Sequence, residues 1–404
     1  MTQLDEKPTE DAEPSSANPP RWRVLARRIS WRWVAIVVAV LLALGVVGTG
    51  GAGYYFAGVL LTVDHTPEYP VTVETVNGNQ VQLSRDSDTE RSVVLGLVWA
   101  DGAAKLGPAI GVNGDHVTRT VTEIVRGTLK PGTKAAIDYN LVDSNPKEAW
   151  GLDFNEVEVT GELGEMPAWF VPATVAQPRS TWVIAVHGRN ATRHEPLRIL
   201  PALASAGLPT LVMTYRNDEG APSSSDGYYH LGDTEWRDVV SGMAYAKAHG
   251  ATSVVLYGWS MGGGMMMTAL RRMSTTEDAF VRGVILDSPA MSWSAVIDQQ
   301  AANRSLPGPI TWSAKLFTEW RGGFDLDDLD QIDYAPKLHV PTLIFVDDTD
   351  HTVPIKPAQE FAKARPDLVT LVTTSGGGHV SSWNANPSRY EDTVQSFLRR
   401  VVQT

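Results

Sequence analysis

An uncharged, mostly apolar run near the N-terminus constrains this 404-residue chain more than any other feature. No charged residue occurs from Trp33 to Val63, and the segment contains the run WVAIVVAVLLALGVV. A helix of about 20 apolar residues is long enough to cross the hydrocarbon core of a bilayer. The buried core helix of a soluble domain is the alternative, but such a helix rarely lacks charge over this length. We therefore predict a single transmembrane helix over residues 33–61.

The residues before this run predict its orientation. Residues 1–20 are acidic and rich in proline, which is typical of a disordered tail, and residues 21–32 contain five arginines. Because positive charge is retained on the cytoplasmic side, we expect residues 1–32 to form a cytoplasmic tail of a single-pass cell-membrane protein whose remainder is extracytoplasmic. A cleaved secretory signal is the alternative, although its apolar part would be unusually long.

Composition excludes several classes of function. Apolar residues make up 43% of the chain, which includes 13 Trp, so there is ample material for a buried core. The absence of Cys excludes disulfides, thiolate nucleophiles and Cys-ligated zinc. A formal net charge of −12 disfavours nucleic acid as a partner, because binding to phosphates needs a concentrated basic surface.

Residues 64–152 predict a small, mainly β domain. The alternating run YPVTVETV is followed by Asn77-Gly78 and then by QVQLS, a strong signal for a β-hairpin. The runs HVTRTVTEIV and KAAIDYNL predict further strands. No motif in this domain carries chemistry, so we interpret it as a spacer or scaffold, with an interaction surface as the alternative.

Residues 153–404 have the pattern of an α/β domain. Short β-branched apolar runs alternate with helical stretches, one of which is TEWRDVVSGMAYAKAHG, and runs of this kind form strands buried on both faces of a parallel sheet. The predicted strands lie at residues 182–186, 210–213, 253–257, 284–287, 342–346 and 368–372. We therefore expect a doubly wound, mostly parallel sheet. The Trp-containing segment 291–340 is too long for an ordinary connection and predicts an inserted cap or, alternatively, a packing insertion.

The pentapeptide Gly258-Trp259-Ser260-Met261-Gly262 is the most specific motif in the chain. It follows the predicted strand SVVLY and precedes a predicted helix, the context of a nucleophile elbow, in which small residues permit a sharp turn that exposes the serine hydroxyl. A serine hydroxyl needs a base, and the base needs an orienting carboxylate. Ser260 is therefore the predicted nucleophile.

The base and the acid are predicted from chain order. His379 lies in SGGGHVSSW after the last predicted strand, where a base would follow a serine and an acid. The loop FVDDTDHTVP supplies the carboxylate, with Asp350 preferred and Asp347 as the alternative. Two backbone N–H groups are predicted to bind the oxyanion, those of Met261 and of Arg189 in the segment His187-Gly188-Arg189-Asn190. The Arg189 side chain is an alternative contact for an acidic or carbonyl group of the substrate.

These motifs together resemble the α/β-hydrolases of the bacterial esterase, lipase and serine-peptidase-like kind. The matching segments are AVHGRNA, TYRN, GDTEWRD, YGWSMGG, ILDSPA, the D-x-x-V-P of residues 350–354, and GGGHV. The resemblance covers roughly residues 153–404 and implies Ser260 as nucleophile, Asp350 as acid, His379 as base, and Met261 and Arg189 as oxyanion donors. It explains nothing before residue 150.

The predicted function is a membrane-tethered serine hydrolase that cleaves an ester, thioester or amide through an acyl-enzyme, without a metal or an organic cofactor. A carboxylic ester is the preferred substrate class, by analogy with the fold, and the substrate would be a small-molecule or lipid-like acyl compound. A peptidase is possible on the same residues. The alternatives are a non-catalytic hydrolase-fold protein that serves binding or envelope architecture, and an acyltransferase that uses the same three residues.

Overall fold

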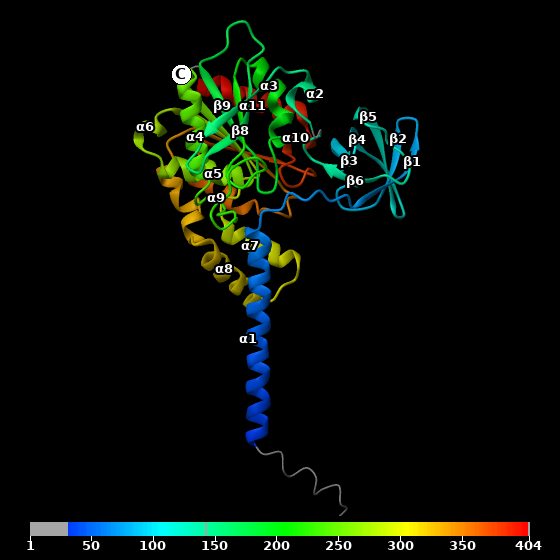
Figure 1. Ribbon diagram of the computed structural model, residues 1–404, viewed down its shortest axis with the longest axis vertical. Helices are drawn as coiled ribbons and strands as arrows, with labels where there is room; N and C mark the ends of the chain where they lie inside the picture. Colours follow the sequence, from blue (N-terminus) through cyan, green and yellow to red (C-terminus); the bar gives the residue numbers. More distant parts are fainter. Residues whose placement is uncertain (1–30, 142–143, 403–404) are drawn as a thin grey trace, which may run out of the picture. The chain divides into compact units, whose positions relative to one another are not determined.

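The structure, a computed structural model, describes residues 31–141 and 144–402 (Figure 1). The predicted cytoplasmic tail lies outside the described residues apart from its last two positions, Trp31 and Arg32. The chain divides into two units, Met1–Gly51 and Ala52–Thr404. Helix α1 (Trp31–Leu61) contains the whole predicted apolar segment, and in the described part of the chain it is the one helix long and apolar enough to cross a membrane.

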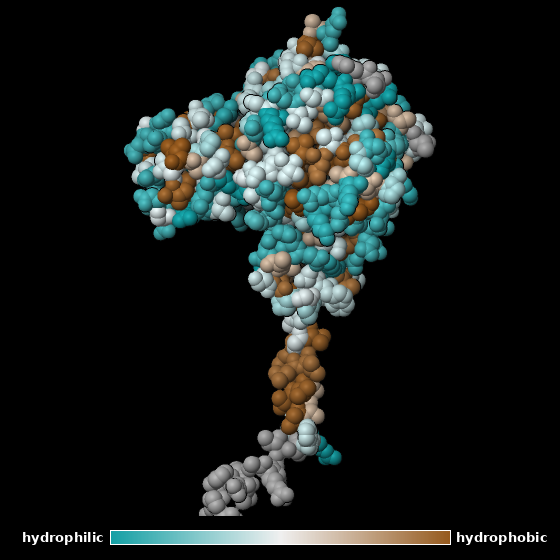
Figure 2. All heavy atoms as spheres, turned by 180° about the vertical axis from the view of Figure 1, so that it is seen from behind, coloured by the Kyte–Doolittle hydropathy of each residue, from teal (hydrophilic) through white to brown (hydrophobic). Residues whose placement is uncertain are grey.

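The surface of α1 changes character along its length. From Trp31 to Val47 its large apolar side chains are exposed, and Figure 2 shows them as a hydrophobic surface. In the last turns Gly53, Ala57 and Leu61 are buried, and Leu61 belongs to the core of the larger domain. The end of α1 is therefore part of that domain, whereas its exposed apolar part needs an apolar environment.

The predicted β-rich domain is a closed six-stranded barrel with the strand order β1-β2-β5-β4-β3-β6. Its strands are β1 (Val71–Asn77), β2 (Gln80–Ser84), β3 (Leu95–Trp99), β4 (Gly102–Asn113), β5 (His116–Arg126) and β6 (Lys134–Asp138). The predicted hairpin is present, with Asn77 paired to Gln80 and with Gly78 at a φ of 61° in the turn. Closure leaves no unpaired sheet edge.

The larger domain is built on an eight-stranded sheet with the order β14-β13-β12-β11-β9-β10-β8-β7. Its strands are β7 (Asn155–Thr160), β8 (Glu165–Val171), β9 (Thr181–Val186), β10 (Thr210–Met213), β11 (Ser253–Trp259), β12 (Val281–Asp287), β13 (Thr342–Asp347) and β14 (Val369–Thr374). All six predicted strands are present and mutually parallel. The antiparallel hairpin β7–β8 extends one edge and was not predicted.

Helices cover both faces of this sheet, so the predicted α/β-hydrolase arrangement is confirmed. Successive residues of β9 alternate between two cores: Ile184 and Val186 face one, Val183 and Ala185 the other. The first core contains side chains of α4 (Trp236–Ala248), α5 (Met261–Arg272) and α9 (Lys356–Ala364). The second contains side chains of η2 (Glu195–Ile199), α3 (Leu200–Ser205), α10 (Ser382–Ala385) and α11 (Pro387–Val402).

The remaining short elements are α2 (Pro146–Trp150) and α6 (Thr275–Asp278). The segment predicted as a cap or packing insertion forms α7 (Trp293–Asn303), α8 (Gly308–Gly322), η3 (Asp327–Leu329) and η4 (Ile332–Lys337).

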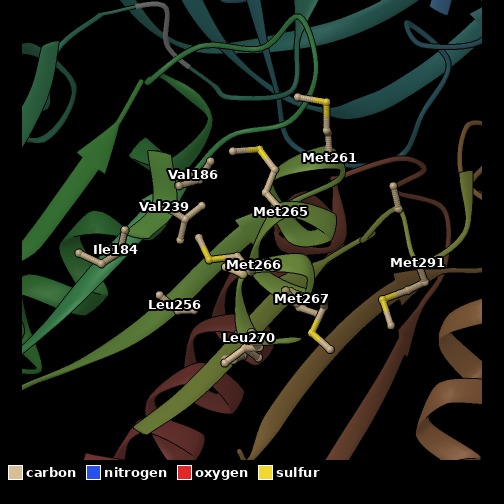
Figure 3. Packing of buried hydrophobic residues seen from close by; sticks show 14 of the residues in the cluster. Ile184, Val186, Val239, Leu256, Met261, Met265, Met266, Met267, Leu270 and Met291 are labelled. Atoms are coloured by element: carbon tan, nitrogen blue, oxygen red, sulfur yellow. The ribbon is translucent and has the colours of Figure 1, made fainter. Parts of the chain in front are cut away.

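Methionines dominate the contact between α5 and the sheet (Figure 3). Met261, Met265 and Met266 are fully buried and lie in one cluster with Ile184 and Val186 of β9. Unbranched thioether side chains fill irregular gaps, which suits a helix that starts at a sharp turn. This packing fixes the start of α5, and with it the residue that precedes α5, Ser260.

A buried carboxylate at the end of β12 makes stability depend on pH. Asp287 is fully buried and accepts a hydrogen bond of 2.9 Å from Tyr390 Oη, but burial dominates and raises its pKa to about 6. Because the folded pKa is above the unfolded value of 3.8, this group stabilises the fold below about pH 4, and that contribution is lost as the pH rises through about 6.

Asp287→Asn should remove this pH dependence. Between pH 4 and pH 8, the free energy of unfolding of Asp287→Asn should rise by about 2 kcal/mol relative to that of the wild type, because only the wild type loses the contribution of the protonated Asp287. Urea unfolding of the detergent-solubilised chain, followed by tryptophan fluorescence at both pH values, measures the difference. Asp348→Asn, at an exposed position, is the control. Equal pH dependence in Asp287→Asn and the wild type would contradict the prediction.

Candidate active site

Ser260 occupies a strained turn between β11 and α5. Its φ of 48° and ψ of −115° lie outside the regions that side chains with a Cβ usually adopt. The flanking glycines are required by space: a Cβ on Gly258 would lie 2.6 Å from the backbone of Gly262, and one on Gly262 would lie 2.3 Å from the Val186 carbonyl oxygen. The close approach of three backbone segments therefore permits only glycine on either side of this turn.

The three side chains predicted to act together lie in hydrogen-bond contact. His379 Nε2 is 2.9 Å from Ser260 Oγ, and His379 Nδ1 is 2.7 Å from Asp350 Oδ2. With Nδ1–H donating to the carboxylate, Nε2 is free to accept the serine proton. The backbone N–H groups of Thr352 and Val353 donate to Asp350 Oδ1 and fix the orientation of the carboxylate.

Asp347, the alternative acid, contacts neither His379 nor Ser260. Its carboxylate accepts hydrogen bonds from the side chains of Thr349 and Thr374 and from the backbone N–H groups of Gly377 and Gly378. Burial on its own would raise the pKa of Asp347, but these hydrogen bonds outweigh it and lower the pKa. Asp347 therefore ties the loop after β13 to the loop that carries His379.

The two predicted oxyanion donors lie beside Ser260. Met261 begins α5, and Arg189 follows Gly188, where an added Cβ would lie 2.9 Å from Ser260 Cβ. Within residues 31–141 and 144–402, neither the Met261 nor the Arg189 backbone N–H donates a hydrogen bond to another group. The Arg189 side chain, an alternative substrate contact, is instead engaged by α1, through bonds of 2.8 Å to the Leu60 carbonyl and 2.6 Å to that of Val59.

A buried charged network that we did not predict supports the Gly188 turn. His187 Nε2 is 2.8 Å from Asp218 Oδ2, and His187 Nδ1 is 2.9 Å from the Gly188 carbonyl. Both nitrogens face acceptors, so only the doubly protonated ring can donate to both. Burial lowers the pKa of His187, but Asp218 and the hydrogen bonds outweigh it and raise the pKa overall. Glu195 accepts the Gly188 N–H at 2.7 Å, which fixes the turn from the other side.

A largely apolar cavity of about 280 Å³ opens onto Ser260 and His379. Three of its walls come from α7, from α8 and from the last turns of α1. The cavity is lined by Phe56, Val59, Leu60, Arg189, Ser260, Trp293, Val296, Ile297, Gln300, Ala301, Arg304, Leu306, Thr311, Ala314, Thr318, Thr352, Val353 and His379. No carboxylate is among these lining residues. The inserted helices therefore cover the serine, and the contribution of α1 was not predicted.

The barrel contacts the loop that carries His379. Arg91 Nη1 donates to the Gly377 carbonyl at 2.6 Å, and Asn384 donates to the Val94 carbonyl at 2.9 Å. Arg119, buried inside the barrel, donates to the carbonyls of Thr89 and Arg91, and burial lowers its pKa to about 10. The barrel therefore holds one side of the base loop, which its sequence motifs did not predict.

Among the residues that the structure describes, no three His, Asp or Glu side chains gather into a cluster that could hold a metal ion.

The sheet, the elbow and the three converging side chains define this chain as an α/β-hydrolase of the serine-hydrolase type. It belongs to the prolyl oligopeptidase family, whose model matches residues 199–404. A second model, described as a domain of unknown function (DUF8805), matches residues 72–138, which correspond to the barrel. None of the curated proteins matches the chain.

Solved structures of esterases share the fold. One crystal form of an esterase from Pyrococcus furiosus is 19% identical, with a TM-score of 0.51, and the alignment covers 64% of this chain and 95% of the esterase. A second crystal form of that esterase is 20% identical, with a TM-score of 0.50 and coverage of 65% and 97%. At this level of identity the similarity establishes the fold, and the predicted resemblance to α/β-hydrolases is confirmed.

Proposed function

We propose that this protein is a membrane-anchored serine hydrolase that cleaves carboxylic esters through an acyl-enzyme on Ser260. The observation that carries the proposal is the pair of contacts made by His379, 2.9 Å to Ser260 Oγ and 2.7 Å to Asp350 Oδ2. A base so placed can take the serine proton, and a carboxylate so placed can orient the base and stabilise its cation.

The reaction proceeds in two acyl transfers. His379 Nε2 takes the Ser260 proton while Oγ attacks the ester carbonyl, and the backbone N–H groups of Met261 and Arg189 bind the developing oxyanion. His379 then gives its proton to the departing alcohol, which leaves Ser260 acylated. Water repeats the sequence: His379 takes its proton, the oxygen attacks the acyl carbon, and Ser260 recovers its proton as the acid departs.

The lining of the cavity favours an apolar acyl group. Side chains such as Phe56, Val296 and Ile297 surround the space next to Ser260, and none of the lining residues is a carboxylate that could pair with a peptide amine. An ester is therefore the proposed substrate, and an amide or thioester would use the same steps. The family name favours peptide hydrolysis as the second candidate.

The membrane anchor is α1. Its exposed apolar side chains run over a length close to the roughly 20 residues that cross a bilayer, and the five arginines of residues 21–32 favour an N-terminus in the cytoplasm. Retention of the helix, rather than cleavage as a signal, is supported by Leu61, which is fully buried and whose carbonyl accepts the Tyr229 N–H at 2.9 Å.

Labelling with a fluorophosphonate probe tests the nucleophile. The full-length chain in detergent should be labelled, and Ser260→Ala should not be, because the probe reacts with a serine whose proton a base removes. Ser388→Ala, at an exposed serine, is the matched control and should label like the wild type. Labelling that survives Ser260→Ala would remove Ser260 from the mechanism.

The products of turnover distinguish hydrolysis from the alternatives. With a nitrophenyl ester and an added alcohol, a hydrolase releases free acid, whereas an acyltransferase forms the new ester because the acyl-enzyme is intercepted by the alcohol. Dominant transfer would reassign the protein as an acyltransferase. An unlabelled wild type without turnover of any ester or amide would favour a non-catalytic binding protein.

A further inference from the structure

Helix α8 has an unusual distribution of side chains. Its buried positions hold small or polar residues, namely Ser313, Ala314, Thr318 and Gly322. Its exposed positions hold large apolar ones: Trp312 is 64% exposed, Leu316 44% and Trp320 72%. These three residues are four apart, so they form one stripe along the helix. We call Trp312, Leu316 and Trp320 the α8 stripe. A helix in contact with water on that side would show the opposite arrangement.

Helix α8 packs against the C-terminal turns of α1. A Cβ on Gly53 would lie 2.1 Å from Ser313 Oγ, so only glycine permits this approach. The rings of Tyr54 and Phe317 meet edge to face with centroids 5.6 Å apart. Arg321 donates to the Tyr54 carbonyl at 3.1 Å, and Figure 1 shows α8 beside these last turns of α1.

This contact determines the depth at which α8 would lie. The uncharged run begins at Trp33, and about 20 residues of helix cross the hydrocarbon core, so the far surface of the bilayer falls close to Gly53 and Tyr54. Tryptophan and tyrosine are enriched at that depth, because one part of the ring is apolar and the other carries a hydrogen-bond donor.

We propose that the α8 stripe is a membrane-docking surface, inserted into the head-group region of the bilayer that α1 crosses. The inference rests on the proposed membrane anchoring by α1. Thr311, Ala314 and Thr318, on another face of the same helix, line the cavity beside Ser260. It follows that this cavity lies next to the membrane surface and receives acyl chains from it. The proposed substrate class is therefore an ester that resides in the bilayer.

The docking surface is apolar rather than electrostatic. The residues just after α8 include Asp325, Asp327 and Asp328, all exposed, which would not be drawn to anionic lipid. The stripe itself contains no charge, so its attraction is the removal of aromatic and aliphatic surface from water. Docking should therefore be as strong on zwitterionic phosphatidylcholine as on a mixture with phosphatidylglycerol.

The absence of Cys makes the test direct, since a single introduced Cys can be labelled alone. Trp320→Cys and Leu316→Cys would each carry a nitrobenzoxadiazole label in the full chain, reconstituted into phosphatidylcholine vesicles that contain a lipid with a nitroxide on its head group. Both labels should be quenched and shifted to the blue. Ile110→Cys in the barrel, where Ile110 is 55% exposed, is the matched control and should show neither effect.

Three outcomes would overturn the proposal. The first is quenching of the Trp320 and Leu316 labels no stronger than that of the Ile110 label. The second is quenching that requires phosphatidylglycerol, which would indicate attraction by charge. The third is energy transfer between labelled chains in dilute vesicles without lipid quenching, which would indicate that the stripe faces a second copy.

An activity measurement separates this inference from the proposed catalysis. The double variant Trp312→Ser, Trp320→Ser should hydrolyse a water-soluble nitrophenyl acetate at the wild-type rate, because neither residue lines the cavity. Its hydrolysis of a long-chain fluorogenic ester embedded in the vesicles should fall roughly tenfold, because α8, which lines the cavity, no longer inserts into the head-group region from which the ester enters. Unchanged hydrolysis of the embedded ester would overturn docking and leave catalysis intact, whereas Ser260→Ala should abolish both activities.

Discussion

His379→Ala should lower kcat for a nitrophenyl ester by about 10⁴-fold or more, with a much smaller change in KM. Its imidazole is the group that can take the Ser260 proton, at an Nε2–Oγ distance of 2.9 Å. Without it, the hydroxyl attacks with its proton still in place. The loss falls on kcat because proton transfer belongs to the transition state rather than to binding.

Double substitution provides a stringent check on this expectation. His379→Ala combined with Ser260→Ala should be no slower than Ser260→Ala alone, because residues that act as a unit are not additive. His351→Ala, at an exposed histidine in the loop that also carries Asp350, should stay within a few-fold of the wild type. A His379→Ala variant with nearly normal kcat would exclude this residue as the base.

Asp350→Asn should lower kcat by about 10⁴-fold and leave the melting temperature almost unchanged. Asparagine Oδ1 can still accept the Thr352 and Val353 N–H groups that Asp350 accepts, so the loop keeps its hydrogen bonds. The amide cannot accept from His379 Nδ1 as the carboxylate does at 2.7 Å, so the imidazole loses both its orientation and its counter-charge.

Asp347→Asn should instead lower the melting temperature and change kcat much less than Asp350→Asn does. The Asp347 carboxylate accepts hydrogen bonds at both oxygens, from Gly378 at Oδ1 and from Thr374 and Gly377 at Oδ2, so the amide that replaces either oxygen faces donors. Unsatisfied buried groups of this kind cost about 2–4 kcal/mol, so the melting temperature should fall clearly. Thermal unfolding and ester kinetics on both variants distinguish the roles. A normal melting temperature with a 10⁴-fold lower kcat in Asp347→Asn would make Asp347 the acid.

The features that could be predicted from the sequence are those that depend on residues close together in the chain. The strand, turn and helix around Ser260 are contiguous in the chain. The close backbone approach at this turn requires glycine at positions 258 and 262, and these glycines are visible in the sequence. The six β-branched runs became six parallel strands, because burial on both faces leaves a continuous apolar signature. The order of Asp350 and His379 after Ser260 then placed both side chains at the same edge of the sheet.

What could not be predicted depends on contacts between distant segments. The bond from Arg189 to the Leu60 carbonyl joins residues 129 positions apart, and nothing in the apolar pattern of α1 indicates that its end enters a cavity wall. The ion pair between His187 and Asp218 similarly unites two loops. Strand β7 was missed because its valines alternate with polar residues and only Val159 is buried, and strand β8 was missed because Pro167 lies within its apolar run.

The place of Phe56, Val59 and Leu60 in the cavity wall affects how this enzyme has to be purified and assayed. Removing residues 1–63 would take away the exposed apolar surface of α1, which lowers solubility. The same deletion removes these three wall residues and the carbonyl groups that accept hydrogen bonds from Arg189. The space filled by Leu61 would be left vacant in the core. Low turnover by such a shortened protein would therefore reflect the loss of the cavity wall rather than the reactivity of Ser260. Substrate specificity should be measured on the chain that retains α1, reconstituted in a lipid nanodisc.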